Sequence, residues 1–208
     1  MELPDERRRT VQAGYDALAP RFSAWGEQIE GDPWERFLTQ LADRLPDRAH
    51  VLDLGCGNGA KTKRLAQRFE VVGVDISEEQ LRLARGEVPD ATLVQADFAE
   101  LDFPAESFDA VTAFYSITHV PREEHEALFG RIHGWLKPGG FFLASLGARG
   151  GEDWTGEWQG VEMFFSSHDA DTNRRVLREV GFGLVVDEVV AMREPEGEAT
   201  FLWVLASA

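Results

Sequence analysis

The chain has 208 residues, of which 43% are hydrophobic and six are tryptophan, so it is long enough for one domain with a packed core and short for two. Its formal net charge of −16 at pH 7 disfavours a nucleic-acid partner, because affinity for nucleic acids comes largely from cations that neutralise phosphates. No apolar run approaches the ~20 residues that cross a bilayer, so we expect no membrane-spanning helix.

Apolar spacing predicts two helices ahead of the first strand. Residues 5–19 form the first helix, which Pro20 is expected to stop because proline lacks a backbone N–H. The second helix is expected to begin at Pro33 with Asp32 as its N-cap, and its apolar residues from Trp34 to Leu45 recur at helical spacing.

Strands and helices alternate in the middle of the chain. The expected strands are 50–54, 71–75, 92–95, 108–114 and 141–146, and the expected helices are 59–69, 78–86, 121–135 and 169–180. Ser77 is the expected N-cap of the helix at 78–86, with Gln80 three residues later. Two further strands, 182–190 and 200–206, have no helix between them and are expected to form an antiparallel hairpin around a turn at 194–197.

These elements predict an α/β fold with a single Rossmann-like, doubly wound sheet of seven strands. The sheet is mostly parallel with an antiparallel C-terminal hairpin, and the N-terminal helices are added to it. We expect one domain, with residues 1–46 as a helical lid or substrate segment and 47–208 as the ligand-binding core. Residues 150–165, rich in glycine and aromatic residues, are expected to form a long loop.

The most informative segment is Val51-Leu52-Asp53-Leu54-Gly55-Cys56-Gly57-Asn58-Gly59. A strand runs here into three alternating glycines at the start of a helix. Glycine lets the backbone approach a ligand without a Cβ, and a helix N-terminus offers unpaired N–H groups. Asp75 ends the next strand, where an acid can accept the hydroxyls of a ribose. The pattern predicts a nucleoside-binding unit.

The glycine turn alone leaves the nucleoside open. Gly55 to Ala60 also satisfies the dinucleotide pattern with alanine last. However, the third glycine follows the second by only two residues, and Asp53 would repel a pyrophosphate in this turn. A ligand with a cationic group is therefore favoured.

Five segments then follow one another in a fixed order. They are the segment from Val51 to Gly59, Asp75-Ile76, Ala96-Asp97-Phe98, Phe108-Asp109-Ala110-Val111 with Phe114-Tyr115-Ser116, and Leu136-Lys137-Pro138-Gly139-Gly140. In this order they resemble the motifs of class I S-adenosylmethionine-dependent methyltransferases of the small-molecule type. The resemblance implies an enzyme of class EC 2.1.1.-, which transfers a methyl group from S-adenosylmethionine to a small-molecule O, N, S or C acceptor and leaves S-adenosylhomocysteine.

The resemblance also implies a set of cofactor contacts. The residues are Tyr15, Asp53, Gly55, Cys56, Gly57, Asn58, Gly59, Asp75, Ile76, Gln80, Asp97, Phe98, Phe114 and Tyr115. Among them Asp75 is expected to hold the ribose and Asp97 to meet the adenine amino group. Tyr15 lies in a segment similar to the one that folds over the cofactor in small-molecule enzymes of this class.

His119 is the candidate general base. It follows the fourth strand at the carboxyl edge of the sheet, and the pKa of a histidine can lie near the working pH. His168 follows the loop after the fifth strand and is a second candidate. The acceptor is expected between the N-terminal helices and the aromatic loop, with Trp25, Trp154 and Trp158 as candidate substrate contacts.

Three other functions remain open at this point. They are a macromolecular methyltransferase acting on protein or RNA, a nicotinamide-dependent oxidoreductase, and a non-catalytic protein that binds S-adenosylmethionine. No group of residues has metal-ligand spacing, so no metal is expected. The basic cluster Arg7-Arg8-Arg9 has no apolar segment after it and Cys56 is the single cysteine, so we expect no signal peptide and a cytoplasmic location. The acceptor and the oligomeric state are not determined by the sequence.

Overall fold

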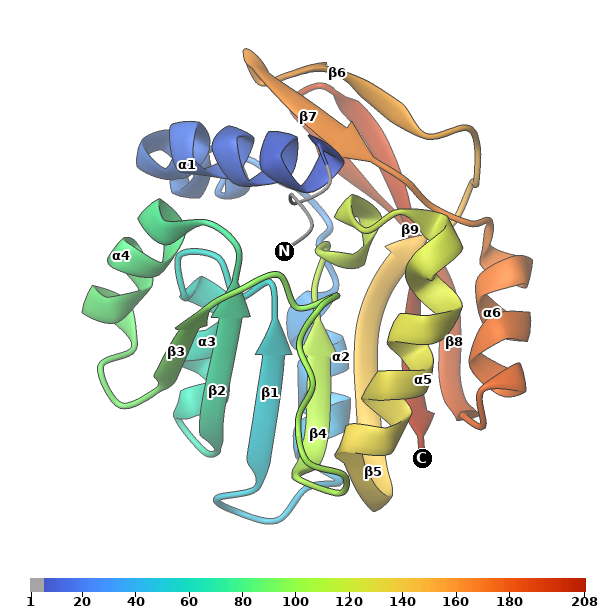
Figure 1. Ribbon diagram of the computed structural model, residues 1–208. Coiled ribbons are helices and arrows are strands. Elements are labelled where there is room, and N and C mark those ends of the chain that lie inside the picture. Colours follow the sequence, from blue (N-terminus) through green and yellow to red (C-terminus); the bar gives the residue numbers. More distant parts are fainter. Residues whose placement is uncertain (1–5) are drawn as a thin grey trace.

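The computed structural model describes residues 6–208, and its main feature is one twisted sheet of seven strands (Figure 1). The strands are β1 (His50–Leu54), β2 (Glu70–Asp75), β3 (Thr92–Gln95), β4 (Phe108–Ala113), β5 (Leu136–Gly147), β8 (Gly183–Glu194) and β9 (Gly197–Ser207). Across the sheet their order is β3-β2-β1-β4-β5-β9-β8. The first five run parallel, whereas β9 pairs antiparallel with β5 and β8. The predicted mostly parallel, Rossmann-like sheet with an antiparallel C-terminal hairpin is confirmed.

The strand order creates a switch point between β1 and β4. The chain moves outward from β1 to β2 and β3, and then returns to the other side of β1 to form β4 and β5. Open α/β sheets bind ligands beyond the carboxyl ends of the strands at such a point, because the loops on the two sides diverge and leave a crevice. The glycine turn after β1 therefore lies at the entrance of that crevice.

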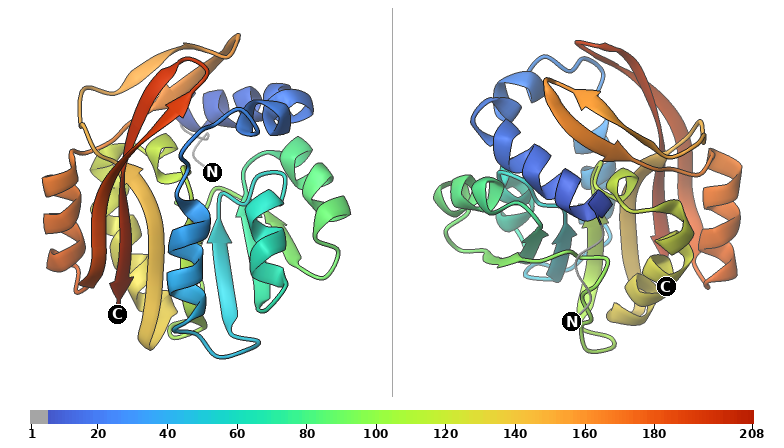
Figure 2. Two further views of the ribbon diagram at one scale, coloured as in Figure 1. Left: turned by 180° about the vertical axis from the view of Figure 1, so that it is seen from behind. Right: turned by 45° about the horizontal axis from the view of Figure 1, so that its top comes forward.

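Helices cover both faces of the sheet (Figure 2). The helices are α1 (Glu6–Gly26), α2 (Trp34–Ala42), α3 (Ala60–Ala66), α4 (Glu78–Glu87), α5 (His125–Trp135) and α6 (Ala170–Glu179), with short 3-10 helices at Ile117–His119 and Arg122–Glu124. Successive residues of a strand point to opposite faces. Val51 accordingly belongs to the apolar cluster that contains Phe37 of α2, whereas Leu52 belongs to the one that contains Phe129 of α5. The core is thus two apolar layers, one on each side of the sheet.

Helix α1 crosses the carboxyl edge of the sheet and packs against a small second sheet (Figures 1 and 2). This second sheet consists of β6 (Trp154–Trp158) and β7 (Val161–Phe165). A Cβ added to Gly14 of α1 would lie 2.9 Å from the carbonyl oxygen of Glu162 and 2.7 Å from Cε of Met163. The helix and strand approach so closely because residue 14 has no side chain.

The prediction that Pro20 ends the first helix is wrong. Helix α1 continues through Pro20 to Gly26. Pro20 itself is exposed, while its neighbours Leu18 and Ala19 are buried to 0% and 2% exposure. Burial of this flank offsets the roughly 3 kcal/mol that an internal proline costs a helix. The extra turns carry Phe22 and Trp25 to the site described below.

The prediction of a loop at 150–165 is also wrong, because residues 154–165 form the β6–β7 hairpin. Its turn residues Gln159 and Gly160 have φ of 53° and 76°. Two central residues with positive φ are typical of the two-residue turns that join hairpin strands. A glycine between two aromatic stretches, here Gly160, is the sequence feature that could have predicted this hairpin.

Other differences concern boundaries. Helix α2 begins at Trp34, one residue later than expected, and Asp32 accepts a hydrogen bond from the Trp34 N–H at 3.1 Å although Pro33 holds the N-cap position. Ser77 caps α4 as predicted by accepting a hydrogen bond from the Gln80 N–H.

No helix within residues 6–208 is long and apolar enough to cross a membrane.

Candidate active site

A cavity of about 540 Å³ lies at the carboxyl edge of the sheet, under α1. We divide its wall into two parts by the elements that supply it. The inner part comes from the ends of β1, β2 and β3 and from α4, and it includes Asp53, Gly55, Cys56, Gly57, Asn58, Asp75, Ile76, Gln80, Asp97 and Phe98. The outer part comes from the end of α1, the chain that follows it, β6–β7 and β8–β9, together with Lys61 of α3 and Tyr115 after β4. Its residues include Phe22, Trp25, Asp32, Trp34, Lys61, Tyr115, Trp158, Phe165, Met192, Glu194 and Phe201.

The glycine turn opens the inner part to a ligand. Gly55 has φ of 76°, and a Cβ there would lie 2.3 Å from Cβ of Ser116, so only glycine fits. Gly57 also has a positive φ, 54°, but its missing Cβ would meet nothing within 4 Å. The first glycine is thus required for packing, and the second leaves open space beside the backbone.

Asp75 is fixed by the turn that it faces. Its two carboxylate oxygens accept hydrogen bonds from the Gly57 N–H at 2.8 Å and the Ser77 N–H at 2.9 Å. Burial raises the pKa of Asp75 to about 6, although these hydrogen bonds lower it. Each carboxylate oxygen has a second lone pair, so Asp75 retains acceptor capacity toward the cavity.

Asp53 is a second buried acid on this side. It is 2% exposed and accepts hydrogen bonds from the hydroxyls of Thr62 at 2.7 Å and Thr112 at 2.8 Å. Burial raises the pKa of Asp53, and the two hydroxyls oppose that shift. The inner part therefore contains two buried acids, Asp53 and Asp75, which suit a ligand with a cationic group.

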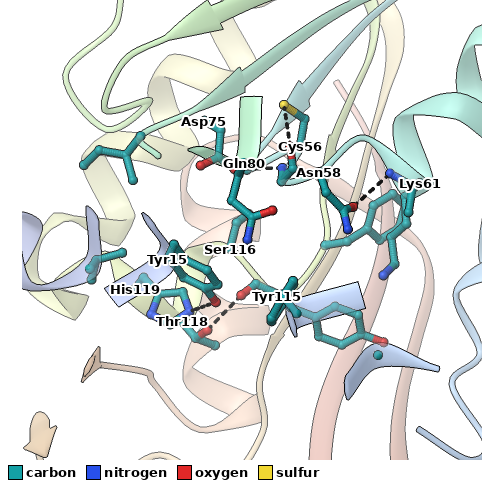
Figure 3. A pocket seen from close by; sticks show the side chains of 18 of the residues that line it. Tyr15, Cys56, Asn58, Lys61, Asp75, Gln80, Tyr115, Ser116, Thr118 and His119 are labelled. Carbon is teal, nitrogen blue, oxygen red and sulfur yellow. Dashed lines mark hydrogen bonds between the residues drawn. The ribbon is translucent and has the colours of Figure 1, made fainter. Parts of the chain in front are cut away.

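Gln80 provides the clearest sign of a missing ligand. Its side chain points into the cavity (Figure 3) and is only 1% exposed. Neither its amide nitrogen nor its amide oxygen has a hydrogen-bond partner within residues 6–208. A buried amide without partners costs free energy, so this position fits a polar ligand that supplies both a donor and an acceptor.

His119 is held by two hydrogen bonds. Its Nδ1 lies 2.8 Å from the carbonyl oxygen of Phe164, and its Nε2 lies 2.8 Å from the hydroxyl of Tyr15. Since a carbonyl can only accept, Nδ1 donates and Nε2 accepts from Tyr15. Burial lowers the pKa of His119 to about 4, so the ring is neutral at pH 7. Both ring nitrogens are engaged, and His119 fixes the position of Tyr15.

Tyr15 lies where the two parts of the cavity meet. Burial raises the pKa of its hydroxyl, and the charges of Asp75 in the inner part and Glu194 in the outer part raise it further. Figure 3 shows the Tyr15 ring next to His119 with its hydroxyl turned toward the imidazole. Tyr15 is therefore a neutral wall residue that comes down from α1.

Most of the predicted site residues line this cavity. Ile76, Phe98 and Phe114 are in its wall, and so are Asn58, Cys56, Trp25 and Trp158.

Three predicted site residues lie elsewhere. Gly59 is the N-cap of α3, with φ of 85°. His168 hydrogen-bonds through Nε2 to the carbonyl of Arg122 at 3.1 Å and packs against His125. Trp154 on β6 is 46% exposed. None of these three residues is part of the cavity wall.

Asp97 and Tyr115 have partners that the sequence did not indicate. Asp97 forms an ion pair of 2.5 Å with Nε of Arg8, which reaches it from α1. Tyr115 has φ of 60° and donates its hydroxyl to Asp32 at 2.5 Å, so its ring faces the outer part. Asp97 is thus paired with a cation of α1, and Tyr115 contributes to the outer wall.

Sequence reasoning missed the charged residues of the outer part. Lys61 lies over the rings of Trp34 at 5.6 Å and Tyr115 at 5.1 Å, and burial lowers its pKa. Glu194 ends β8 and had been expected within a turn. Helix periodicity gives no sign of the orientation of Lys61, and an acid beside Pro195 is typical of an exposed turn.

Comparisons with known proteins agree with this geometry. Residues 51–140 match the family model described as a methyltransferase domain. The chain is 36% identical over 152 residues to 27-O-demethylrifamycin SV methyltransferase of Amycolatopsis mediterranei, covering 62% of this chain and 55% of the relative. It is 32% identical over 157 residues to demethylmenaquinone methyltransferase of Symbiobacterium thermophilum, covering 67% and 60%. The chain thus spans little more than half the length of these relatives.

A solved structure extends the likeness to the whole fold. The 1,6-didemethyltoxoflavin-N1-methyltransferase of Burkholderia thailandensis, solved with 1,6-didemethyltoxoflavin and S-adenosylhomocysteine, superposes with a TM-score of 0.74. The likeness covers 100% of this chain and 91% of that one at 21% sequence identity. At this identity it establishes the fold of the chain and not its substrate.

Proposed function

The chain belongs to the class I S-adenosylmethionine-dependent methyltransferases, and on this premise we propose that it transfers a methyl group from S-adenosylmethionine to a small molecule. The observation that carries the proposal is the continuity of the cavity. One space joins an inner part with buried acids and an unpartnered amide to an outer part lined by aromatic rings. A donor and an acceptor of a group would meet within such a space.

The residues of the inner part fit the cofactor. Asp75 would hold the ribose hydroxyls, and the open backbone at Gly57 would face the chain of the methionine part. Asp53 would attract the ammonium group of that part, and Gln80 would supply the polar contacts that it lacks within the protein. The bound cofactor supplies an electrophilic methyl group on a sulfonium.

The protein contributes position and exclusion of water. Holding an acceptor in line with the methyl group supplies roughly 7–11 kcal/mol of the barrier in favourable cases. Tyr15, fixed by His119, and the aromatic rings from α1 and β7 form the roof that keeps the acceptor in place. His119 acts here as a positioning residue, because its basic nitrogen already accepts a hydrogen bond from Tyr15.

The cover over the cavity supports a small acceptor. Helix α1, the β6–β7 hairpin and the tip of β8–β9 all contribute to its wall, so the site lies under three elements and not on an open surface. The net charge of −16 further disfavours RNA. The two relatives are named for 27-O-demethylrifamycin SV and demethylmenaquinone, which are small molecules of different chemistry.

Binding of S-adenosylhomocysteine by calorimetry tests the cofactor site. We expect Asp75→Ala to abolish binding, and Gln80→Ala to weaken it about tenfold because the ligand loses its hydrogen bonds to the amide. The Gln80 side chain has no hydrogen bond to any other residue between 6 and 208, so the Gln80→Ala variant should keep its fold. Gln67→Ala, exposed at the end of α3, is the matched control.

Unchanged affinity in both cavity variants would contradict the cofactor assignment. Transfer of labelled methyl groups to a panel of small acceptors, with RNA and protein as further arms, then tests the activity. Binding of S-adenosylhomocysteine without transfer to any arm would favour a non-catalytic binding protein.

A further inference from the structure

Aromatic rings form a continuous wall in the outer part of the cavity. Phe22 and Trp25 stack with their centroids 5.6 Å apart, and Trp158 meets Trp25 edge-on at 5.4 Å. Tyr15 contacts Phe22 at 5.5 Å and Phe165 contacts Trp158 at 5.5 Å. The faces of tryptophan and tyrosine rings attract cations, by about 0.5–1 kcal/mol when exposed and about 2 kcal/mol or more when desolvated.

Glu194 is a half-buried acid of the same outer part, and its carboxylate has no hydrogen bond or ion pair to any residue between 6 and 208. The two neighbouring acids whose charges raise the pKa of Glu194, Asp32 and Glu196, both accept hydrogen bonds from other residues. Asp32 accepts the hydroxyl of Tyr115 at 2.5 Å, and Glu196 accepts Nε1 of Trp25 at 3.0 Å. Glu194 is thus the carboxylate in this region that remains available to a ligand.

The charges around Glu194 favour a cation beside it. Burial, Glu196 and Asp32 together raise its pKa to about 7, since each makes a further negative charge costly. Lys61 is the cation of the outer wall, but it sits between the rings of Trp34 and Tyr115, where Asp32 and Asp53 compensate its charge. Glu194 is left without a counter-charge of its own.

We propose that the acceptor is an amine, which binds in the outer part with its ammonium group against Glu194 and its apolar portion along the aromatic wall. This inference rests on the proposed function and assigns the substrate class of the same site. The stacked rings and the unpaired carboxylate are independent features, and both select a cation. A carboxylate acceptor would instead meet Glu194 with a like charge.

Glu194 also gives the proton a destination. The ammonium group passes one proton to the Glu194 carboxylate, which leaves a neutral amine with a free lone pair. That lone pair forms the new N–CH3 bond, while the S–CH3 bond breaks and its electron pair stays on sulfur. His119 does not compete for this proton, because its Nε2 accepts from Tyr15 and its Nδ1 carries the proton donated to Phe164.

A matched ligand series tests the proposal. We would measure binding of phenethylamine, 2-phenylethanol and 3-phenylpropionate to the protein saturated with S-adenosylhomocysteine, by calorimetry at pH 8. We expect the amine to bind at least tenfold more tightly than the alcohol, and the carboxylate to bind most weakly. Glu194→Gln should remove the preference for the amine and leave the affinities for the alcohol and for S-adenosylhomocysteine within twofold of the original.

Glu198→Gln is the control, because Glu198 lies on the same hairpin but pairs with Arg149 on the surface. It makes the same change in charge and should leave all affinities unchanged. Equal binding of amine and alcohol, or an equal loss of amine affinity in both variants, would overturn the proposal. If S-adenosylhomocysteine itself fails to bind, the proposed function fails first, so the two failures are distinguishable.

Discussion

At the scale of single residues, the histidine that the sequence offered as a base is held by two hydrogen bonds. Its position after β4 was predicted correctly, and it does line the cavity. The hydroxyl of Tyr15 and the carbonyl of Phe164 occupy its two nitrogens, however, and burial makes its charged form costly. A histidine acts as a base only when one nitrogen faces the substrate with a free lone pair. Here the same ring ties α1 and β7 to the sheet.

The buried, neutral His119 predicts a pH dependence of stability. Its pKa is about 4 when folded and 6.5 when exposed, so the unfolded chain takes up the proton more readily. The stabilisation is complete above pH 6.5 and is lost as the pH falls toward 4, by ~3 kcal/mol.

His119→Gln isolates this effect, since glutamine can replace both hydrogen bonds but does not titrate. In urea unfolding, we expect the variant to gain ~3 kcal/mol relative to the original chain between pH 7 and pH 4. His125, whose pKa is also lowered to about 4 by burial, is present in both proteins and cancels. Parallel pH profiles would show that His119 is not the group responsible.

At the scale of elements, α1 covers the cavity and is held at both ends by polar contacts. Near its start Arg8 pairs with Asp97 at 2.5 Å, Glu124 at 2.5 Å and Glu100 at 3.0 Å. Near its end Trp25 donates to Glu196 in the turn of β8–β9. The hairpin at the far edge of the sheet and the helix that precedes the sheet therefore close the cavity together.

Removal of Arg8 should loosen the lid. Its side chain and that of Asp97 are only 16% and 18% exposed, so the pair is screened less than a surface pair and its loss leaves Asp97 without its cation. We expect Arg8→Gln to raise the opening of α1 about tenfold, which corresponds to ~1.4 kcal/mol. Hydrogen exchange of the α1 amides measures this opening.

Arg9→Gln provides the comparison, because Arg9 is exposed on the same helix and the change in charge is identical. Equal exchange in the two variants would mean that net charge, and not the Arg8 ion pairs, controls the lid.

At the scale of the whole molecule, the cavity wall draws on distant parts of the chain. The lid helix, the glycine turn after β1, the end of β4 and the tip of β8–β9 all contribute to it. A ligand in the cavity contacts elements from both ends of the sequence, and a ligand that binds only the folded state stabilises that state as a whole.

S-adenosylhomocysteine should therefore raise the free energy of unfolding of the entire chain. At a concentration 100 times its Kd we expect a gain of about 2.7 kcal/mol, measured by urea unfolding at 25 °C. Protection from hydrogen exchange should increase in α1 as well as in β1 and β2. A gain confined to the residues around Gly57, with α1 unchanged, would show that the lid does not take part in binding.

The sequence by itself determined the seven strands of the main sheet, its mostly parallel character and the local turn and cap positions, but neither the β6–β7 hairpin nor the order of the strands. β1 and β3 have the predicted bounds, Ser77 caps α4 as expected, and the three glycines at 55, 57 and 59 adopt the positive φ that their turn requires. These features depend on neighbours in the chain, since hydrophobic period, capping and glycine conformations are local properties.

Only the tertiary structure decided what the outer part of the cavity contains. Tyr15 meets His119 across 104 residues, and Trp25 meets Glu196 across 171. Helix α1 passes through Pro20 because packing offsets the local cost. Glu194 lines the cavity because β8 continues to residue 194, beyond its predicted end at residue 190. Contacts between residues so far apart in sequence arise from the packing of whole elements. A local sequence pattern therefore cannot predict which side chain this packing leaves without a partner.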